Sequence, residues 1–368
     1  MQVTVNPKVL EWAFSYARKT PKEILRKFPI SDKWLTGEKK PTIHQLEQVA
    51  KFTEVPFGYL LLQEVPCIPE EKVTDFRTIQ NRRQRPEGYS TELRDTIQTM
   101  RERQDWLRDY KKENFYAPVT FLGTINTNMN ETAIDTIIRK TLGIPRDWFN
   151  HCKKNDALNY FRSRIEALGV VVFINGIVGN NTHRKLNIEE FRGFALPDPY
   201  APLIFVNGAD TSNGRLFTLL HEMIHLFLNQ EALDDGTESF CNRIAASILV
   251  PYDFFLTEWN KGPEDFEHLA EVFPVSKLVL YRVALTLNLI SQDQWKKLHF
   301  GFLQQIKKSN IGGGGNFNYI LPNRIGHSFS RFVFNALREG NLMYTDAYHL
   351  LGIKGKTFQN AMNKAEAQ

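Results

Sequence analysis

The sequence predicts an α+β protein that is mostly helical, and three observations lead to this fold class. Apolar residues recur at helical spacing near the start of the chain, through its middle and again near its end. The run GVVVFI is instead continuously apolar, which is typical of a buried strand, and the stretch EFRGFALPDPYAPLIFVNG predicts further strands. Both segments precede a helical stretch, HEMIHLFLN, with two histidines four residues apart. We therefore expect a short β-sheet beside a histidine-bearing helix, with helices on either side along the chain.

Composition and charge exclude several classes of protein. The chain has 368 residues, 42% hydrophobic and 24% charged, which is typical of a globular protein. A net charge of +5 allows contact with DNA but does not require it. The three cysteines, Cys67, Cys152 and Cys241, show no CxxC spacing, so we expect neither a disulfide framework nor a cysteine zinc module. Without a signal peptide or an apolar run of membrane length, a cytoplasmic protein with no membrane partner is expected.

Residues 1–66 are expected to form a small helical domain. The stretches NPKVLEWAFSYAR, PKEILRKF and TIHQLEQVAKFT predict three helices, the last capped by Thr42. The residues predicted to face inward are Val9, Leu10, Ala13, Phe14 and Ala17 in the first helix, and Ile43, Leu46, Val49 and Ala50 in the third. Between Ile24 and Trp34 there is room for one short helix and a turn.

Residues 67–118 are expected to hold a linker and a long helix. The linker is rich in proline and charge, and its arginines Arg82, Arg83 and Arg85 are expected to form a solvated face. The helix is predicted over STELRDTIQTMRERQDWLRDYKKE. Its apolar positions, expected on one side, are Leu93, Ile97, Met100 and Leu107.

Residues 119–300 are expected to form the central domain and residues 301–368 a C-terminal helical region. In the central domain a helix leads into GVVVFI, and EFRGFALPDPYAPLIFVNG predicts two further strands around a proline-rich turn. Helices are predicted over FLTEWN, EDFEHLAEVF, VSKLVLYRVALTLNLI and SQDQWKKLHFGFLQQIKK. The run IGGGGNF lacks the preceding strand and following Lys-Ser/Thr of a phosphate loop, so it predicts a connector before the C-terminal helices.

The spacing of HEMIHLFLN indicates a metal site on a helix. Residues four apart lie one turn apart on the same face, so His221 and His225 can direct imidazole nitrogens at one ion. Glu222 is offset by about 100° and can reach a water at that ion, where it would act as the catalytic base. A bare HExxH arises by chance in a chain of this size in roughly one case in a hundred to a few hundred. A buried histidine can also be a satisfied core group.

A third ligand is needed, because catalytic zinc usually has three protein ligands. The helix predicted over TESFCNRIAASILVP supplies Glu238 near its start and ends at a proline. A carboxylate at that position could also simply favour the helix dipole. Rival ligands in the preceding loop are Glu231, Asp234 and Asp235.

Two further residues of this helix bear on the site. Asn242 lies one turn after Glu238 and is expected to orient its carboxylate, although it could be a plain surface residue. Cys241 is expected to be a small buried hydrophobe.

These motifs carry a family resemblance. LLHEMIHLFLN followed by ESFCNRIAASILVP is similar to the ImmA/IrrE-type zinc metallopeptidases, and WLTGEKKPTIHQLEQVAKFTEVPFGYLLL resembles the back half of a phage-repressor-type (Xre-like) helix-turn-helix domain. The resemblance covers nearly the whole chain, but the helix-turn-helix is shortened and Cys-Asn replaces the common Ala-Asn at 241–242. It implies a gluzincin-like HExxH site, with Zn²⁺ on His221, His225 and Glu238 and with Glu222 as general base.

The resemblance also implies a function. Such proteins are regulatory zinc endopeptidases that cleave or inactivate a specific protein, such as a helix-turn-helix repressor, in a prophage, mobile-element or toxin-antitoxin setting. The N-terminal domain would then contact DNA or the protein partner. The alternative is a non-catalytic Xre-type regulator or antitoxin that binds a partner protein and DNA and has a structural or vestigial zinc site. The group that would stabilise the oxyanion is left open; Tyr281, His268 and His299 lie on downstream helices, and each is expected to be structural.

Overall fold

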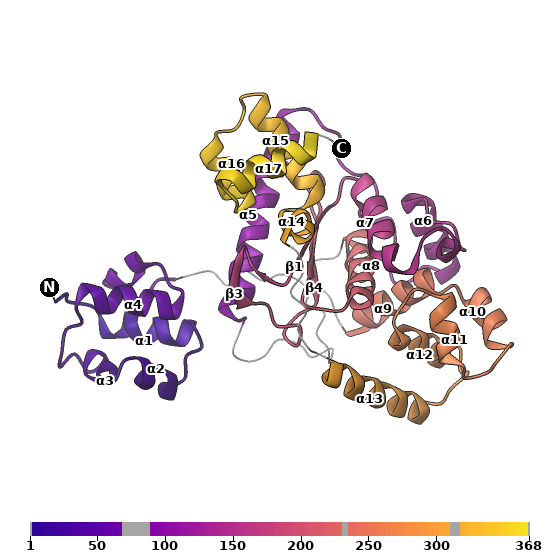
Figure 1. Ribbon diagram of the computed structural model, residues 1–368, viewed down its shortest axis with the longest axis horizontal. Helices are drawn as coiled ribbons and strands as arrows, with labels where there is room; N and C mark the ends of the chain where they lie inside the picture. The colour runs from indigo at the N-terminus through magenta and orange to yellow at the C-terminus, as the bar shows by residue number, and fades with distance from the viewer. Residues whose placement is uncertain (1, 68–88, 230–234, 310–316, 367–368) are drawn as a thin grey trace. The chain divides into compact units, whose positions relative to one another are not determined.

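A computed structural model of the chain describes residues 2–67, 89–229, 235–309 and 317–366. These residues are mostly helical with a small mixed sheet, which confirms the predicted fold class (Figure 1). They divide into two compact units, one made of residues 2–67 and 89–98 and the other of the described residues from Thr99 onwards. The linker arginines and the glycines of the predicted connector lie outside the described residues.

The first unit is a small helical domain. Its elements are α1 (Pro7–Tyr16), α2 (Pro21–Lys27), α3 (Ser31–Leu35), α4 (Ile43–Thr53), a 3₁₀ turn (Phe57–Leu61) and the first part of α5 (Thr91–Glu113). Thr42 caps α4 as predicted, because its hydroxyl accepts from the Gln45 amide while the Gln45 side chain accepts from the Thr42 amide. Leu46 and Val49 are fully buried against α1 residues such as Leu10. The domain therefore has a core of its own.

One residue of this unit that was predicted to face the core does not. Ile43 is 38% exposed, whereas Leu46 and Val49 on the same helix are fully buried. At 100° per residue Ile43 falls about 60° from Leu46, on the side away from Val49, and it is the first residue of α4. It therefore lies at the edge of the apolar stripe and at the end of the helix. In α5 the predicted apolar positions are all buried: Leu93, Ile97, Met100 and Leu107.

The second unit contains the sheet, whose centre is β5 (Leu203–Asn207). It pairs in parallel with β1 (Val171–Asn175) and antiparallel with β4 (Gly193–Leu196), which confirms the two strands predicted around the proline-rich turn. Every residue of β1 and β5 is buried, because helices pack against the sheet. A separate hairpin, β2 (Ile177–Val178) and β3 (Asn181–Lys185), was not predicted, since β3 has no apolar residue that would reveal a strand.

Helices surround this sheet. Before and after it lie α6 (Glu131–Leu142), α7 (Ala157–Ala167), α8 (Ser212–Leu228) and α9 (Asp235–Leu249). The predicted downstream helices are α10 (Tyr252–Trp259), α11 (Phe266–Val272), α12 (Lys277–Thr286) and α13 (Gln292–Ser309). The C-terminal helices are α14 (Phe317–Ile325), α15 (His327–Arg338), α16 (Tyr344–Leu351) and α17 (Gly355–Glu366). Helix α8 packs against β4, β5, α7 and α9, whereas α14 and α15 pack against β1. Within the described ranges no helix has the length and apolar character needed to cross a membrane.

Candidate metal centre

The histidine motif lies on α8, which runs through the interior of the second unit. Thr211 caps its start by accepting from the Gly214 amide at 3.1 Å, and Asn229 ends it in the left-handed conformation at φ 48°. All residues from Leu216 to Leu228 are buried, because the sheet covers one side of the helix and α7 and α9 cover others. His221 and Glu222 are consequently 0% and 1% exposed.

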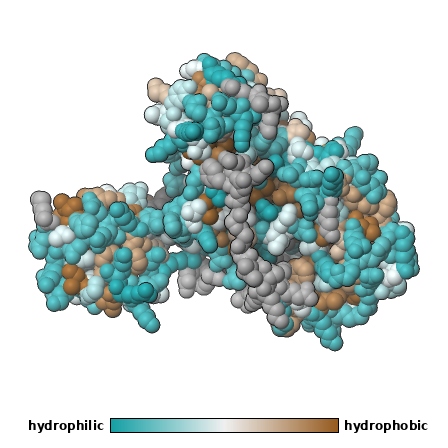
Figure 2. All heavy atoms as spheres, viewed as in Figure 1, coloured by the Kyte–Doolittle hydropathy of each residue, from teal (hydrophilic) through white to brown (hydrophobic). Residues whose placement is uncertain are grey.

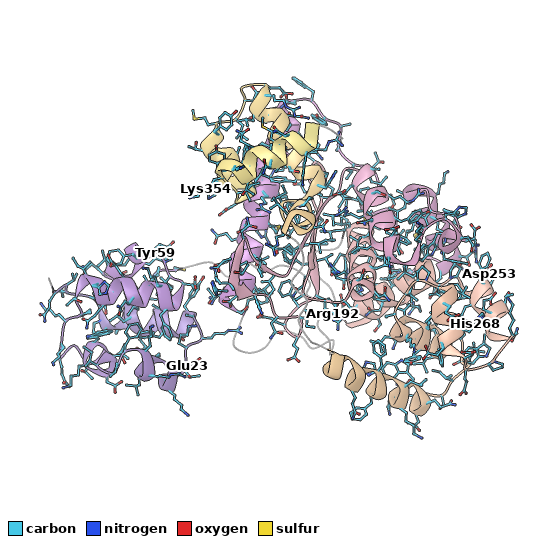
Figure 3. All side chains as sticks on the ribbon, viewed as in Figure 1. Glu23, Tyr59, Arg192, Asp253, His268 and Lys354 are labelled. Carbon is cyan, nitrogen blue, oxygen red and sulfur yellow. The ribbon has the colours of Figure 1, made fainter. Side chains whose placement is uncertain are left out.

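The beginning of α8 is tied to the sheet by an ion pair. Arg192, labelled in Figure 3, precedes β4 and donates from Nη1 to Asp210 Oδ2 at 2.7 Å. Asp210 is only 8% exposed, and it lies so close to the first turn of α8 that a Cβ at Gly214 would be 2.5 Å from its carboxylate. This contact sets the direction in which α8 leaves the sheet.

Three side chains meet where α8 and α9 pack together. The Nε2 atoms of His221 and His225 lie 2.9 Å apart. Glu238, from the first turn of α9, places Oε2 3.3 Å from His221 Nε2 and Oε1 3.2 Å from His225 Nε2. Ligands about 2.0–2.1 Å from a tetrahedral ion are roughly 3.3 Å from one another. The three residues therefore form a candidate metal site, and their two-nitrogen, one-carboxylate set suits zinc.

The competing ligands are not placed by the structure. Glu231 and Asp234 lie outside the described residues, and only the backbone of Asp235 is described. Glu238 keeps 15% of its side chain exposed, whereas the His221 side chain is fully buried. Glu238 is thus the most exposed of the three side chains.

Glu222 lies on the sheet side of the cluster, beside β4. A Cβ built on Gly193 would lie 3.2 Å from Glu222 Oε1, 2.9 Å from the Phe205 carbonyl oxygen and 2.5 Å from Thr218 Cγ2. Only glycine therefore allows α8 to approach β4 this closely. Gly193 was not among the predicted site residues, although an isolated glycine in a strand is a known signal of close approach.

Behind His225 lies Cys241, which the sequence predicted only as a buried hydrophobe. Its thiol is fully buried, with Sγ 3.6 Å from His225 Nδ1. A contact at the second ring nitrogen fixes the orientation of a ligating histidine. Asn242, the next residue, is half-buried, and its expected contact with the Glu238 carboxylate stays a prediction.

The carboxyl end of α9 is held by α6 and the turn after it. Arg139 donates from Nη2 to the Ile248 carbonyl at 2.9 Å and from Nε to both carboxylate oxygens of Asp135, at 2.8 and 2.9 Å. Burial lowers the pKa of Arg139, and the Asp135 carboxylate opposes that shift. Trp148 Nε1 donates to the Leu249 carbonyl at 3.0 Å. These donors satisfy carbonyls that a helix end leaves unpaired, so they determine where α9 ends relative to α8.

The downstream residues considered for the oxyanion have structural contacts. His268 Nε2 lies 2.9 Å from Glu258 Oε2, linking α11 to α10 (Figure 3). Tyr281 packs edge-on against Phe266, with ring centroids 4.6 Å apart. His299 stacks on Trp295 at 4.8 Å, and burial lowers its pKa. All three contacts lie among α10–α13, in agreement with the structural roles expected for these residues.

Comparison with known families assigns two segments of the chain. Residues 165–283 match the IrrE N-terminal-like domain of peptidase family M78, a range that contains the sheet, α8 and α9. Residues 325–364, which cover α15, α16 and most of α17, match a domain of unknown function, DUF8813. The chain matches no curated protein and no solved structure. Neither family match reaches the first unit, so its helix-turn-helix resemblance gains no support from them. Residues 165–283 thus form an IrrE N-terminal-like metallopeptidase domain with a candidate metal site at His221, His225 and Glu238.

Proposed function

We propose that the protein is a zinc-dependent endopeptidase. The observation that carries this proposal is a cluster of two imidazoles and one carboxylate beside a buried glutamate, within a domain that matches peptidase family M78. A purely structural zinc site needs only ligands. Glu222 is adjacent to His221 in sequence and only 1% exposed, so a proton acceptor lies buried beside the proposed ligands.

Each residue then has a role in hydrolysis. His221, His225 and Glu238 hold the metal, and the exposed edge of Glu238 marks the side from which substrate enters. Zinc held by these residues would supply Lewis-acid chemistry, which polarises a scissile carbonyl and lowers the pKa of water. Glu222 accepts a proton from the attacking water and returns it to the leaving amine. Cys241 orients the imidazole of His225 through its Nδ1 atom.

We further propose that the substrate is one specific protein, such as a helix-turn-helix repressor or a toxin-antitoxin partner. The support is the resemblance of LLHEMIHLFLN and ESFCNRIAASILVP to regulatory ImmA/IrrE-type peptidases. A first unit with its own core offers a separate surface for recognising that partner.

DNA contact through the first unit remains a weaker proposal. Helix α3, which would read the major groove, has only five residues, and Ser31 and Trp34 among them are buried. A recognition helix needs several exposed side chains to reach base edges.

The test compares wild type with Glu222→Gln. Both should bind one equivalent of zinc, because the ligands are unchanged, but cleavage should fall by a factor of about 10² or more. The substrate is obtained by co-expression, since the inactive variant should retain a protein that the wild type cuts. Glu267→Gln, at a glutamate whose side chain is 81% exposed, is the matched control and should cleave normally.

Two outcomes would contradict this proposal. Undiminished cleavage by Glu222→Gln would exclude its role as base. A captured protein that wild type and Glu222→Gln bind equally, and that neither cuts, would instead favour the non-catalytic regulator.

A further inference from the structure

The last three helices of the chain form a module with the layout of a helix-turn-helix. Helices α16 and α17 are joined by only three residues, Gly352, Ile353 and Lys354. Gly352 adopts the left-handed conformation at φ 64° and ends α16, which allows the chain to turn sharply into α17. A turn of three or four residues containing glycine is characteristic of the helix-turn-helix.

A shared aromatic core holds the module together. Phe358 of α17 is fully buried, and its ring centroid lies 4.8 Å from Tyr348 of α16 and 5.4 Å from Phe334 of α15. Ala347 and Leu351 of α16 are also fully buried. Helix α15 therefore supports the α16–α17 pair as a third helix, and α17 packs on it through the buried Phe358.

The outer face of α17 has a distinctive composition. The exposed side chains at positions i, i+3, i+4, i+7 and i+8, which share one face of the helix, are Lys356, Gln359, Asn360, Asn363 and Lys364. None of them has a hydrogen bond or ion pair with the described residues, and no acidic side chain interrupts the face. By contrast α5, the longest described helix, mixes six acidic residues among its basic ones, as a solvated face usually does.

These groups match the chemistry of double-stranded DNA. Asparagine and glutamine amides pair with adenine edges, and lysines bind guanine edges and phosphates. Residues 325–364 carry five basic and two acidic residues, a net charge of +3 within a chain of net charge +5. The upper part of Figure 2, where α15–α17 lie, shows mostly hydrophilic residues, and Figure 3 labels Lys354 at the edge of this region.

The module is held firmly on the peptidase domain. Asn180, in the turn between β2 and β3, donates from Nδ2 to the Gly352 carbonyl at 2.7 Å. Arg103 of α5 is 5% exposed, and its guanidinium carbon lies 5.0 Å from the Phe173 ring centroid and 5.8 Å from that of Phe329. These contacts join α15 and the α16–α17 turn to the sheet and α5, so α17 is presented by a rigid support.

We propose that α15–α17 are a DNA-binding helix-turn-helix, with α17 entering the major groove. Lys354 and Lys356 at its amino-terminal end and Lys364 further along bind phosphates. Gln359 and Asn360 reach base edges. This inference is independent of peptidase activity and assigns a role to a segment that matches only a domain of unknown function.

The experiment measures binding of the full-length chain to a random-sequence 30-base-pair duplex by fluorescence anisotropy across a salt series. Lys354→Gln/Lys356→Gln/Lys364→Gln should weaken binding at about 50 mM salt by tenfold or more. The slope of log K against log salt should become shallower by about 2 to 3, since each lost phosphate contact removes roughly 0.9. The matched control is Lys140→Gln/Lys153→Gln/Lys297→Gln, which removes the same charge from exposed lysines of the peptidase region.

The control variant should bind nearly as wild type, and both variants should melt at the wild-type temperature. Equal weakening by the two variants would mean that only overall charge matters, and it would overturn the proposal. Absence of wild-type binding at low salt would do the same. So would competition by single-stranded RNA at a lower concentration than the duplex.

Discussion

At Gly193 the absence of a side chain decides how closely the metal-site helix can approach the sheet. The space that a Cβ would occupy is bounded by Thr218 of α8, the Phe205 carbonyl of β5 and Glu222. Two of these neighbours belong to the helix that carries His221 and His225, so any added atom at Gly193 pushes against the site.

Gly193→Ala should therefore destabilise the protein and disturb the site. We expect a loss of about 1–3 kcal/mol in the free energy of unfolding, typical of overpacking, measured by denaturant titration. Cleavage should fall as well, because α8 must shift at Glu222. Gly301→Ala on α13 is the control, since nothing lies within 4 Å of its Cβ, and it should be neutral or slightly stabilising. Wild-type stability of Gly193→Ala would show that the approach is looser than described.

Lys111 is a buried cation whose partners are carbonyls and an aromatic ring. Its Nζ donates to the Tyr200 carbonyl at 2.7 Å and to the Gly169 carbonyl at 3.3 Å, and it lies 5.1 Å from the Phe332 ring centroid. The residue is only 5% exposed. Burial lowers the pKa of Lys111 from 10.5 to about 8, with the Asp198 carboxylate opposing the shift.

This shift predicts how stability depends on pH. Between pH 8 and 10.5 the unfolded chain binds more protons at Lys111 than the folded chain, so folding becomes more favourable as pH rises through that window. From pH 7 to 9 the wild type should gain about 1 kcal/mol in unfolding free energy relative to Lys111→Met. Lys112→Met, at an exposed neighbour, should leave the profile parallel to wild type. If the unfolding free energy of Lys111→Met varied with pH in parallel with that of the wild type, the effect of burial on Lys111 would be contradicted.

Helix α9 depends on partners that are remote in sequence. Its first turn supplies Glu238, while its last carbonyls accept from Arg139 and Trp148, which precede it by about a hundred residues. The Arg139 guanidinium donates to the Asp135 carboxylate and to the Ile248 carbonyl of α9 at the same time, and a lysine cannot reproduce this geometry.

Arg139→Met should leave the Asp135 carboxylate and the α9 carbonyls without their donor. We expect a loss of about 3 kcal/mol in the free energy of unfolding, and Arg139→Lys should restore little of it. The control is Arg146→Met, which breaks an ion pair with Asp253 whose side chains are 51% and 59% exposed. That change should cost less than about 1 kcal/mol. Equal losses for the two variants would mean that Arg139 does not support α9.

At the scale of the whole molecule, the complete candidate metal site lies within one of the two units. His221, His225 and Glu238 all belong to the second unit, and the first has a separate core around Leu10, Phe14 and Leu46. Metal binding should therefore stabilise the second unit alone.

Calorimetry of the full chain tests this separation. Zinc at about a hundred times its dissociation constant adds about 2.7 kcal/mol to the unit that binds it, which should raise one melting transition by about 5 °C. The other transition should stay in place, and a chelator should reverse the shift. In His221→Ala neither transition should respond to zinc. A single transition that moves as a whole would contradict independent units.

Much of the fold followed from local patterns. Helices such as α1, α4 and α5 and the strands β1, β4 and β5 were predicted because periodicity and capping act between residues close together in the chain. The two errors concern features that local sequence patterns do not determine. Ile43 lies at a helix end, and β3 has a polar sequence that pairing with β2 makes a strand.

The sequence by itself determined the mostly helical α+β class and the placing of His221, Glu222 and His225 on one helix, because both depend on spacing along the chain. Only the tertiary structure brought Glu238 within 3.3 Å of the imidazoles, set Cys241 behind His225 and showed that Gly193 must lack a side chain. These contacts join residues on different elements, and their distances depend on how the elements pack. Packing between elements has no periodic pattern in the sequence, whereas the turns of a helix do.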